Sequence, residues 1–395
     1  MKGHGDFFSL KWLDSRALRT RWIRWLAHRV FRSVDSALVG PGQLRVADVH
    51  RIVVLRPNHR LGNLLLITPL ITELERTFPG AEVDIVVGCP AAQELLGKFF
   101  SVRRIHGLPR YMIRHPLFML GTLFRIRSAR YDLGIDTSMG SNSGRLLLAW
   151  TRPRYALGVP NVATGADARW NAIMRSAPRH MAQLPVYVLR SAISTMGSVG
   201  EAHYAPLSAS LAPDERQAGK SILSALTHVH DSAKNTVIVG LFANATGNKR
   251  YNETWWQQFL ATLESSHPEY VIVEIMAAHG RSQLGSRIPS FFSSSPRKMA
   301  AVMSNLTCFV SADCGVMHLA CASDAPTIGL FSVTDASVYA PYGHRSQAVL
   351  TADKSPEQVA EAAIRIIEQV VSMGRVDIAQ NDGPMPLDGQ PLPVH

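Results

Sequence analysis

The chain alternates short β-branched runs with longer amphipathic stretches. Residues 51–56 (RIVVLR) and 81–88 (AEVDIVVG) predict buried strands, and the apolar pattern over 61–78 between them predicts a helix. A further strand is predicted over 131–138, and a helix is predicted after Ser143. This order of strand, helix and strand is typical of a parallel sheet with helices on both faces.

The pattern weakens over residues 205–235 and then restarts. The second set of strands is predicted over 236–244, 270–278, 308–312 and 326–332. The second set of helices is predicted over 253–266, 296–305, 315–323 and 356–373. The class is therefore α/β, with two doubly wound Rossmann-like domains. Ligands of such sheets bind outside the carboxyl ends of the strands, so we expect both domains to face one cleft.

We divide the chain into four parts. They are a basic amphipathic N-terminal extension (1–45), a first Rossmann-like domain (46–210), a second (211–375) and a disordered tail (376–395). The tail is rich in Pro, Gly and Asp, which favours disorder. The division leaves open whether the final helix packs back on the first domain.

The N-terminal extension has a composition of its own. Residues 1–40 contain eight Lys or Arg, three Asp and three Trp. On a helical wheel, one broad side carries Leu18, Trp22, Leu26, Val30 and Val34. The opposite side carries Arg21, Arg24, His28 and Arg32. This pattern favours a surface helix that lies on anionic lipid, and the alternative is a helix packed on the first domain.

Charge and composition limit the classes of partner that the chain could bind. The 395 residues carry a net charge of +11, which suits a phosphorylated substrate, anionic lipid or nucleic acid. Nucleic acid ranks last because no recognition motif for it is present. The four cysteines are too few for a disulfide framework. No apolar run reaches the roughly 20 residues of a membrane span, and charged residues interrupt any signal peptide. We therefore expect a cytoplasmic protein.

The stretch 309–343 carries the most specific chemistry. A strand ends at Asp313, Gly315 permits a tight turn, and a helix follows with His318 one turn inside it. Amide groups at such a helix start favour an anion, which is how a protein holds a diphosphate without a metal. Cys314, His318 and Cys321 also share one helix face, a possible metal site that lacks an evident fourth ligand.

A second polar turn follows the first strand of the second domain. It contains Thr246, the flexible Gly247, and two cations at Lys249 and Arg250. Cations at a turn between strand and helix suit a phosphate. The alternative is a solvated surface loop.

Together these stretches resemble glycosyltransferase family 9, the bacterial heptosyltransferases of lipopolysaccharide core synthesis. The similarity runs in order from about residue 51 to 373. The matching segments are Gly62-Asn63 with Thr68-Pro69, YDLGIDTSMGSNSGR (131–145), Lys249-Arg250-Tyr251-Asn252, DCGVMHLA (313–320), Pro326-Thr327 and FSVTD (331–335).

The resemblance implies a GT-B fold, in which the first domain binds the acceptor and the second binds the nucleotide sugar. It implies inverting transfer of heptose, or a related sugar, from an ADP-sugar to a lipopolysaccharide or other envelope glycan acceptor. The phosphorylated glycolipid acceptor would hold the protein peripherally on the inner face of the cytoplasmic membrane. The donor-binding residues it implies are Thr246, Lys249, Arg250, Asp313, Cys314, Gly315 and His318. No Asp-x-Asp metal motif stands at a suitable strand end, so we expect no obligatory metal or cofactor.

The acceptor side departs from the family pattern at Asn63, where the family usually has an Asp that serves as the proposed general base. An amide cannot accept that proton, although it can orient a hydroxyl. We consider His59 and Asp136 as replacement bases, and Arg60 and Arg145 as phosphate contacts for the acceptor. Alternatively, stabilisation of the departing diphosphate carries most of the rate, or the chain is a catalytically silent sugar-nucleotide-binding or scaffold protein. An epimerase acting on a UDP-sugar has no motif support.

Overall fold

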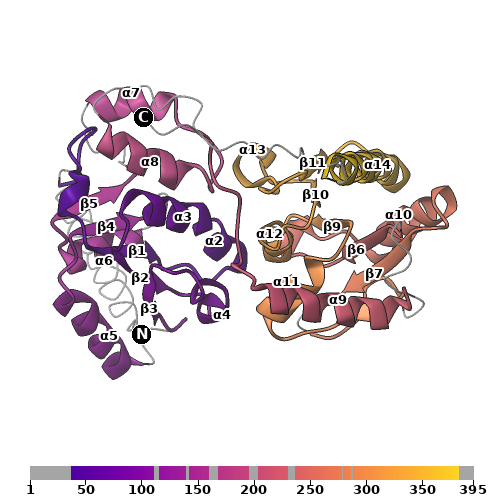
Figure 1. Ribbon diagram of the computed structural model, residues 1–395, viewed down its shortest axis with the longest axis horizontal. Helices are drawn as coiled ribbons and strands as arrows, with labels where there is room; N and C mark the ends of the chain where they lie inside the picture. Colours follow the sequence, from indigo (N-terminus) through magenta and orange to yellow (C-terminus); the bar gives the residue numbers. More distant parts are fainter. Residues whose placement is uncertain are drawn as a thin grey trace, which may run out of the picture. The chain divides into compact units, whose positions relative to one another are not determined.

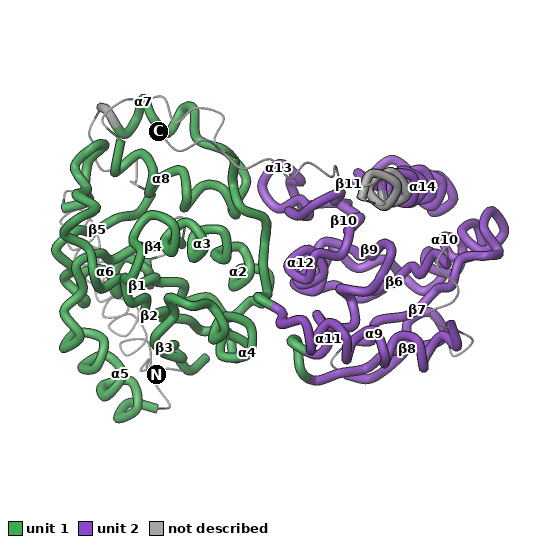
Figure 2. The backbone as a smooth tube through the Cα atoms, in the orientation of Figure 1, with its two compact units in different colours: residues 1–210, 295–297 green, residues 211–294, 298–395 purple. Residues whose placement is uncertain are grey.

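The computed structural model describes residues 37–110, 115–138, 142–159, 168–194, 203–229, 236–277, 279–285 and 288–381. The chain divides into two compact units, drawn in separate colours in Figure 2. The first unit comprises residues 1–210 and 295–297, and the second comprises residues 211–294 and 298–395. Both are α/β units built on a parallel sheet, as the sequence predicted (Figure 1).

The first unit holds a five-stranded sheet in the order β3-β2-β1-β4-β5. Its strands are β1 (Arg51–Arg56), β2 (Glu82–Val87), β3 (Val102–Gly107), β4 (Leu133–Asp136) and β5 (Tyr155–Gly158). Its helices are η1 (Val46–Asp48), α2 (Leu61–Leu65), α3 (Thr68–Thr77), α4 (Ala92–Leu96), α5 (Pro116–Ser128), α6 (Asn142–Thr151), α7 (Ala168–Arg175) and α8 (Leu184–Ile193). All four neighbouring strand pairs are parallel. The side chains of residues 52–55 in β1 are fully buried, which explains its unbroken apolar run.

The predicted helix over 61–78 is two helices, α2 and α3, separated by Leu66 and Ile67. Pro69 causes the interruption because it lacks the N–H that would donate to the carbonyl of Leu65. The hydroxyl of Thr68 donates to that carbonyl instead, at 2.8 Å. The prediction of one helix was therefore wrong, and α2 is a separate short helix directly after β1.

The two faces of the first sheet are covered by different helices. Ile126 of α5 and Leu147 and Leu148 of α6 pack on Val53 and Leu55 of β1. Helices α3 and α8 contact each other and lie on the other side of the sheet (Figure 1). Residues 1–36 lie outside the described residues, so the predicted lipid-binding helix is not described.

The second unit holds a six-stranded sheet in the order β11-β10-β9-β6-β7-β8. Its strands are β6 (Ile238–Phe242), β7 (Val271–Ile275), β8 (Ser290–Phe291), β9 (Cys308–Ala312), β10 (Thr327–Phe331) and β11 (Gln347–Leu350). Its helices are α9 (Pro213–Thr227), η4 (Gly247–Lys249), α10 (Glu253–Ser266), α11 (Pro296–Met303), α12 (Gly315–Ala322), α13 (Ala336–Tyr339) and α14 (Pro356–Asn381). All of its neighbouring strand pairs are parallel.

The core of the second unit joins α10 and α14. Trp256 and Phe259 of α10 are buried in one cluster with Val359, Ala363 and Ile367 of α14. The final helix thus packs within the second unit. It also continues to Asn381, beyond the start of the predicted tail at residue 376, and residues 382–395 lie outside the described residues.

Each sheet has a topological switch point, where the chain reverses the direction in which it adds strands. In the first sheet β1 leads to β2 and β3 on one side and to β4 and β5 on the other. In the second sheet β6 leads to β7 and β8, whereas β9 leads to β10 and β11. The switch points lie between β1 and β4 and between β6 and β9. Ligands of open α/β sheets bind at the carboxyl ends of such strands.

Candidate active site

Arg56, the last residue of β1, lies at the first switch point and links the segments around it by hydrogen bonds. Its Nη1 donates to the carbonyl of Thr137, just after β4, at 2.5 Å. Its Nε and Nη2 donate to the backbone oxygen and the side-chain Oδ1 of Asn63, at 3.2 and 3.0 Å. Arg56 is only 5% exposed, so a buried cation holds the start of α2 against the end of β4. Arg56 was not among the predicted site residues, although an arginine that ends an apolar strand was a signal for this role.

Asn63 is partly exposed and accepts from Arg56 through Oδ1. The amide therefore presents its Nδ2 hydrogens to any further partner. Such a group donates to a hydroxyl oxygen and cannot remove a proton from it. The geometry fits an orienting role for Asn63 and not the role of a base.

His59 lies in the loop between β1 and α2 with its ring fixed by one hydrogen bond. Its Nδ1 lies 2.6 Å from the carbonyl oxygen of Gly88, which follows β2. A carbonyl can only accept, so Nδ1 carries the proton and the Nε2 of the neutral ring presents a lone pair. Gly88 allows this arrangement, because a Cβ there would lie 2.7 Å from the His59 ring. The partly exposed Nε2 has no partner among the described residues.

Asp136 and Arg145, predicted as a base and as an acceptor contact, are paired with each other. Arg145 Nη1 donates to Asp136 Oδ2 at 3.1 Å, and Arg145 Nη2 donates to the carbonyl of Val159. The Asp136 side chain is fully enclosed and also accepts from the Ser138 hydroxyl. Burial raises the pKa of Asp136, against the lowering effect of Arg145. In this arrangement the pair fixes the loop after β4.

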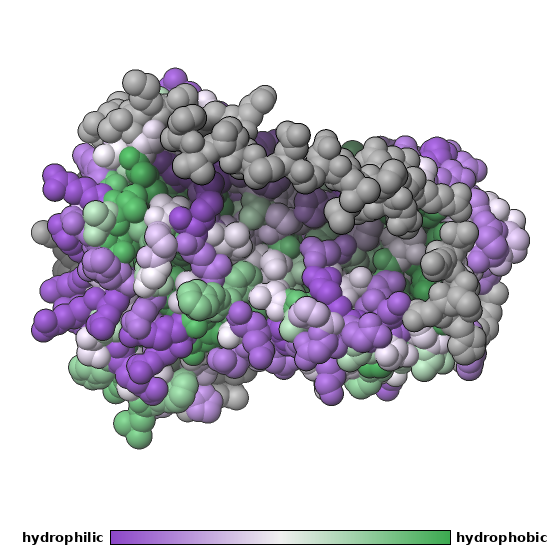
Figure 3. All heavy atoms as spheres, in the orientation of Figure 1, coloured by the Kyte–Doolittle hydropathy of each residue, from purple (hydrophilic) through white to green (hydrophobic). Residues whose placement is uncertain are grey.

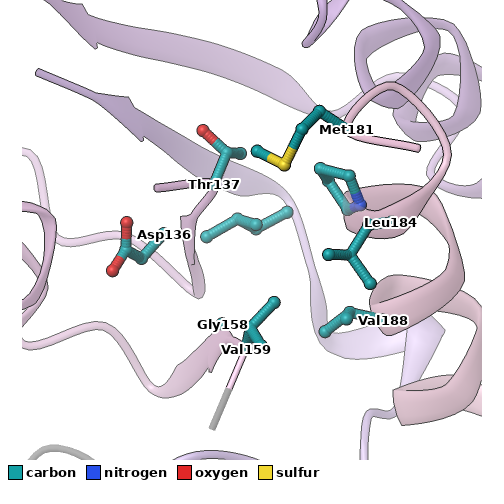
Figure 4. A pocket seen from close by; sticks show the side chains of 9 residues that line it. Asp136, Thr137, Gly158, Val159, Met181, Leu184 and Val188 are labelled. Carbon is teal, nitrogen blue, oxygen red and sulfur yellow. The ribbon is translucent and has the colours of Figure 1, made fainter. Parts of the chain in front are cut away.

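A small hollow adjoins Asp136 at the ends of β4 and β5. The lining is mostly apolar, and the Asp136 carboxylate points away from Met181, Leu184 and Val188 (Figure 4). The hollow has room for about one water molecule, so its volume is too small for a sugar. Arg60, in contrast, is exposed at the start of α2. Its backbone N–H donates to Asn58 Oδ1 and its backbone carbonyl accepts from Leu64, whereas its guanidinium has no hydrogen-bond or ion-pair partner among the described residues.

The second switch point joins Lys249 and Asp313. Lys249, after β6, donates through Nζ to Asp313 Oδ2 at 2.5 Å, and Asp313 follows β9 directly. The Asp313 side chain is 6% exposed, whereas the Lys249 side chain is 32% exposed. Two of the predicted donor-binding stretches therefore meet at one point of the sheet. The ammonium group remains accessible from solvent.

Helix α12 begins beside this ion pair. Cys314 is its N-cap residue with extended backbone, and residues 314–316 are partly exposed. The amide groups of the first turn have no partners within the helix, so the start of α12 is suited to an anion. The predicted residues Asp313, Cys314 and Gly315 therefore lie together, and His318 is buried one turn further along.

Two cysteines lie at α12: Cys314 at the N-cap is a partly exposed residue, and Cys321 within the helix is buried. Burial raises the pKa of Cys314, whose Sγ lies 3.3 Å from the Ser311 hydroxyl. Burial also raises the pKa of Cys321 to about 11. Both groups are therefore neutral thiols near pH 7. Within the described ranges, no three His, Cys, Asp or Glu side chains are grouped to hold a metal ion.

The turn after β6 has two further contacts. Thr246 is exposed, and Gly247 adopts a positive φ of 63° that favours glycine. Arg250 donates through Nη2 to Gln283 Oε1 at 2.6 Å, pointing toward the loop after β7. That loop also provides His279, whose Nε2 lies 3.0 Å from the Asn244 amide. The sequence analysis did not identify His279 or Gln283.

Tyr251 and Asn252, which follow the Lys249 turn, both have structural roles. Asn252 caps α10 by accepting from the N–H of Trp255 at 2.8 Å. The Tyr251 hydroxyl lies 2.6 Å from Thr351 Oγ1, and its ring stacks on Trp255 at 4.2 Å. Burial raises the pKa of Tyr251, so it is a neutral donor or acceptor next to the Lys249 turn.

Comparison with known proteins confirms the resemblance for part of the chain. Residues 296–366, which contain Asp313, α12 and β10, match the model of glycosyltransferase family 9 (heptosyltransferase). The first-domain segments and the Lys249 turn lie outside that match. No curated protein matches the chain by sequence.

Solved structures confirm the fold. A glycosyl transferase family 9 structure from Veillonella parvula DSM 2008 is similar over 83% of this chain and 99% of its own, with a TM-score of 0.64 and 15% identity. The ADP-heptose lps heptosyltransferase II of E. coli is similar over 81% and 99%, with a TM-score of 0.59 and 15% identity. The E. coli heptosyltransferase WaaC with ADP covers the same shares, with a TM-score of 0.58 and 15% identity. The chain therefore has the GT-B fold of heptosyltransferases, and fold and family match together support glycosyltransferase activity.

Proposed function

We propose that the chain is an inverting glycosyltransferase that moves heptose, or a related sugar, from an ADP-sugar to a lipopolysaccharide or other envelope glycan acceptor. The observation that carries the proposal is the Lys249–Asp313 ion pair at the second switch point, beside the free helix start at Gly315. The ADP in the WaaC structure supports an ADP-sugar as the donor.

On the donor side, Lys249 and the amide groups at the start of α12 would hold the diphosphate. Asp313 keeps the ammonium in place until a ligand arrives, and the phosphate oxygens then share it. Thr246 and Arg250 extend the same edge, Cys314 is the N-cap residue of α12, and His318 lies one turn inside that helix. This arrangement stabilises the negative charge that develops on the leaving group, and it requires no metal.

On the acceptor side, His59 is the base that we favour over Asp136. Its Nε2 is accessible and is left as the acceptor by the Gly88 hydrogen bond, whereas the Asp136 carboxylate is enclosed with Arg145. Asn63 orients the acceptor hydroxyl through its amide hydrogens. The exposed Arg60 meets an acceptor phosphate, and Arg145 keeps the β4 loop in position.

The reaction would be one in-line displacement. The acceptor oxygen forms a bond to the anomeric carbon while the bond from that carbon to the diphosphate oxygen breaks. The hydroxyl proton passes to His59 Nε2, and the electron pair leaves with ADP. An imidazole whose Nε2 carries a lone pair can serve as the general base for such a transfer.

A catalytically silent binding protein is the second candidate, and Asn63 is the observation that favours it. Such a protein would bind ADP-heptose and never release ADP. For both candidates we place the protein peripherally on the inner face of the cytoplasmic membrane, with residues 1–40 on anionic lipid. No described helix is long and apolar enough to span a bilayer.

The experiment measures ADP release from ADP-heptose with and without a lipopolysaccharide core acceptor. The wild type is compared with His59→Gln, Asp136→Asn and Asn63→Asp. We expect acceptor-dependent release in the wild type, a loss of roughly 100-fold or more in His59→Gln, and a change below about 10-fold in Asn63→Asp. Donor binding without release, with activity gained only in Asn63→Asp, would instead establish the silent protein.

A further inference from the structure

Helix α5 exposes an apolar face. Leu117, Leu120 and Phe124 recur at helical spacing and are 84%, 51% and 64% exposed, and the adjacent Phe118 is 53% exposed. A helix on a protein surface normally places polar residues at these positions. Figure 3 shows hydrophobic side chains gathered at the lower left, over the end of the first unit where α5 lies.

The exposure does not come from a poorly packed helix. Thr122 and Ile126 on the opposite side of α5 are buried, and Ile126 belongs to the core that covers β1. Two hydrogen bonds also fix α5 to α6. Trp150 Nε1 donates to the carbonyl of Leu123 at 2.9 Å, and Arg127 Nη1 donates to the carbonyl of Trp150 at 2.5 Å. The apolar face is therefore held outward by a rigid support.

Helix α6 extends the same apolar area. Its Leu146 and Trp150 are one helical turn apart and are 49% and 39% exposed. Trp150 also lies under the Arg127 guanidinium, 5.6 Å from the ring centroid. Tryptophan with one polar edge and one apolar face is typical of the boundary between water and lipid.

The sequence around this face is basic. Residues 100–131 contain seven arginines and no Asp or Glu, although Arg103 pairs with Asp84 and Glu82. Arg125 is exposed next to Phe124, and its Nε donates to the Gly121 carbonyl of its own helix. Arg125 and Arg127 have no carboxylate partner in the part of the chain that the structure describes. Uncompensated cations beside exposed Leu, Phe and Trp complement an anionic bilayer in both charge and polarity.

We propose that this docking face, formed by Leu117, Phe118, Leu120, Phe124, Leu146 and Trp150, binds an anionic lipid bilayer. The apolar side chains enter the boundary between headgroups and acyl chains, while Arg125 and Arg127 contact the lipid phosphates. The attachment is independent of residues 1–40. It also does not depend on the proposed reaction, although it would bring the first unit to a membrane-bound acceptor.

The test uses the full chain and measures co-sedimentation with vesicles of phosphatidylcholine containing 30% phosphatidylglycerol. The probe variant is Leu117→Gln with Leu120→Gln and Phe124→Gln. Because all three side chains are exposed, the variant should fold normally, which circular dichroism checks. Ile222→Gln is the matched control, since Ile222 is 41% exposed on α9 of the second unit. A companion variant, Arg21→Gln with Arg24→Gln, probes the N-terminal extension.

We expect the triple variant to bind these vesicles roughly 10-fold or more weakly than the wild type, and Ile222→Gln to bind like the wild type. Arg125→Gln should reduce binding to the anionic vesicles by a smaller factor and leave binding to pure phosphatidylcholine unchanged. Equal binding by the triple variant and the wild type would overturn the proposal. If only the companion variant lost binding, the membrane contact would belong to residues 1–40 instead. The proposal would also be overturned if the wild type bound no vesicle and formed an oligomer that is absent in the triple variant. The face would then bind a second copy of the chain. ADP release with a lipid-free acceptor should be unchanged in the triple variant, so failure of this proposal is separable from failure of the proposed function.

Discussion

The two switch points have the same topology, and each holds one cation, but the two cations differ in exposure. Between β1 and β4, Arg56 is buried and donates to three protein oxygens from Asn63 and Thr137. Between β6 and β9, Lys249 is one-third exposed and contacts a single carboxylate, that of Asp313. The hydrogen bonds of Arg56 hold the fold together, whereas Lys249 remains accessible to a ligand.

This difference indicates how one topology serves two purposes. A buried guanidinium with all its hydrogen bonds made within the protein acts as a clamp on the loops around it. A flexible ammonium with one partner can exchange that partner for an incoming phosphate at a small cost in free energy. We therefore propose that Arg56 supports the loops of the first unit that would bind the acceptor, and that Lys249 would stabilise the charge of the donor diphosphate.

The largest effect should follow Lys249→Met. The variant removes the cation at the second switch point and leaves the buried Asp313 carboxylate unpaired. We expect the kcat/KM for the ADP-sugar to fall by roughly 100- to 1000-fold, the range for loss of one group that stabilises a developing charge. ADP release is the measurement, and Lys220→Met on the exposed face of α9 is the control. Equal losses in both variants would remove the distinction between the two cations.

Arg56→Met should act on folding first. The substitution leaves the Thr137 carbonyl and both oxygens of Asn63 without their donor. We expect the first unit to lose about 3 kcal/mol of its free energy of unfolding, read from its transition in urea. Arg60→Met, at an exposed position in the same loop, should leave that transition unchanged. A stable Arg56→Met protein that has lost only activity would make Arg56 a ligand contact and not a clamp.

Gly88→Ala tests whether activity depends on the position of the His59 ring. The new Cβ would lie 2.7 Å from the ring, so the imidazole must swing away from its hydrogen bond to the carbonyl of residue 88. We expect kcat to fall roughly 10- to 100-fold with little change in stability, because a partly exposed side chain can move. Gly107→Ala is the control, since nothing lies within 4 Å of a Cβ built there. Unchanged kcat would indicate that the His59 position is not used.

Asp84 extends the contrast to the acid stability of the first unit. Burial raises the pKa of Asp84, but hydrogen bonds from Arg103 and Tyr131, together with the His106 ring at 3.5 Å, outweigh it and hold the pKa well below its ordinary value of 3.8. The ionised form therefore stabilises the fold above about pH 4, and this contribution is lost as the pH falls below that value. Asp84→Asn should cost about 2 kcal/mol at pH 7 and less with each step below pH 4.

Urea unfolding at pH 7, 5, 4 and 3 measures this trend. The exposed Glu361→Gln on α14 is the control and should show no comparable loss at pH 7. A difference between Asp84→Asn and the wild type that stays constant down to pH 3 would contradict the depressed pKa.

The local structure of the second switch point was predictable because its signals are local. A strand that ends at Asp313, a glycine two residues later and an apolar helix describe the turn within ten residues. The strand over 308–312 and the helix over 253–266 were confirmed to the residue. The meeting of Lys249 with Asp313 followed only from the topology, since 64 positions separate them.

The structure of the first switch point was harder to predict because its contacts are tertiary. Nothing near residue 56 in the sequence shows that Arg56 turns back onto α2 and the end of β4. The pairing of Asp136 with Arg145 depends on how α6 returns over the strand, so two predicted site residues bind each other. The break between α2 and α3 was visible as Pro69, whose missing N–H was not weighed against the apolar periodicity.

The most direct test of the account is calorimetric titration of ADP into the wild type, Lys249→Met and Arg60→Met. We expect ADP to bind the wild type and Arg60→Met with similar Kd values, and to bind Lys249→Met roughly 10-fold or more weakly. ADP binding that survives Lys249→Met unchanged, or that is lost in Arg60→Met, would contradict a donor site at the second switch point.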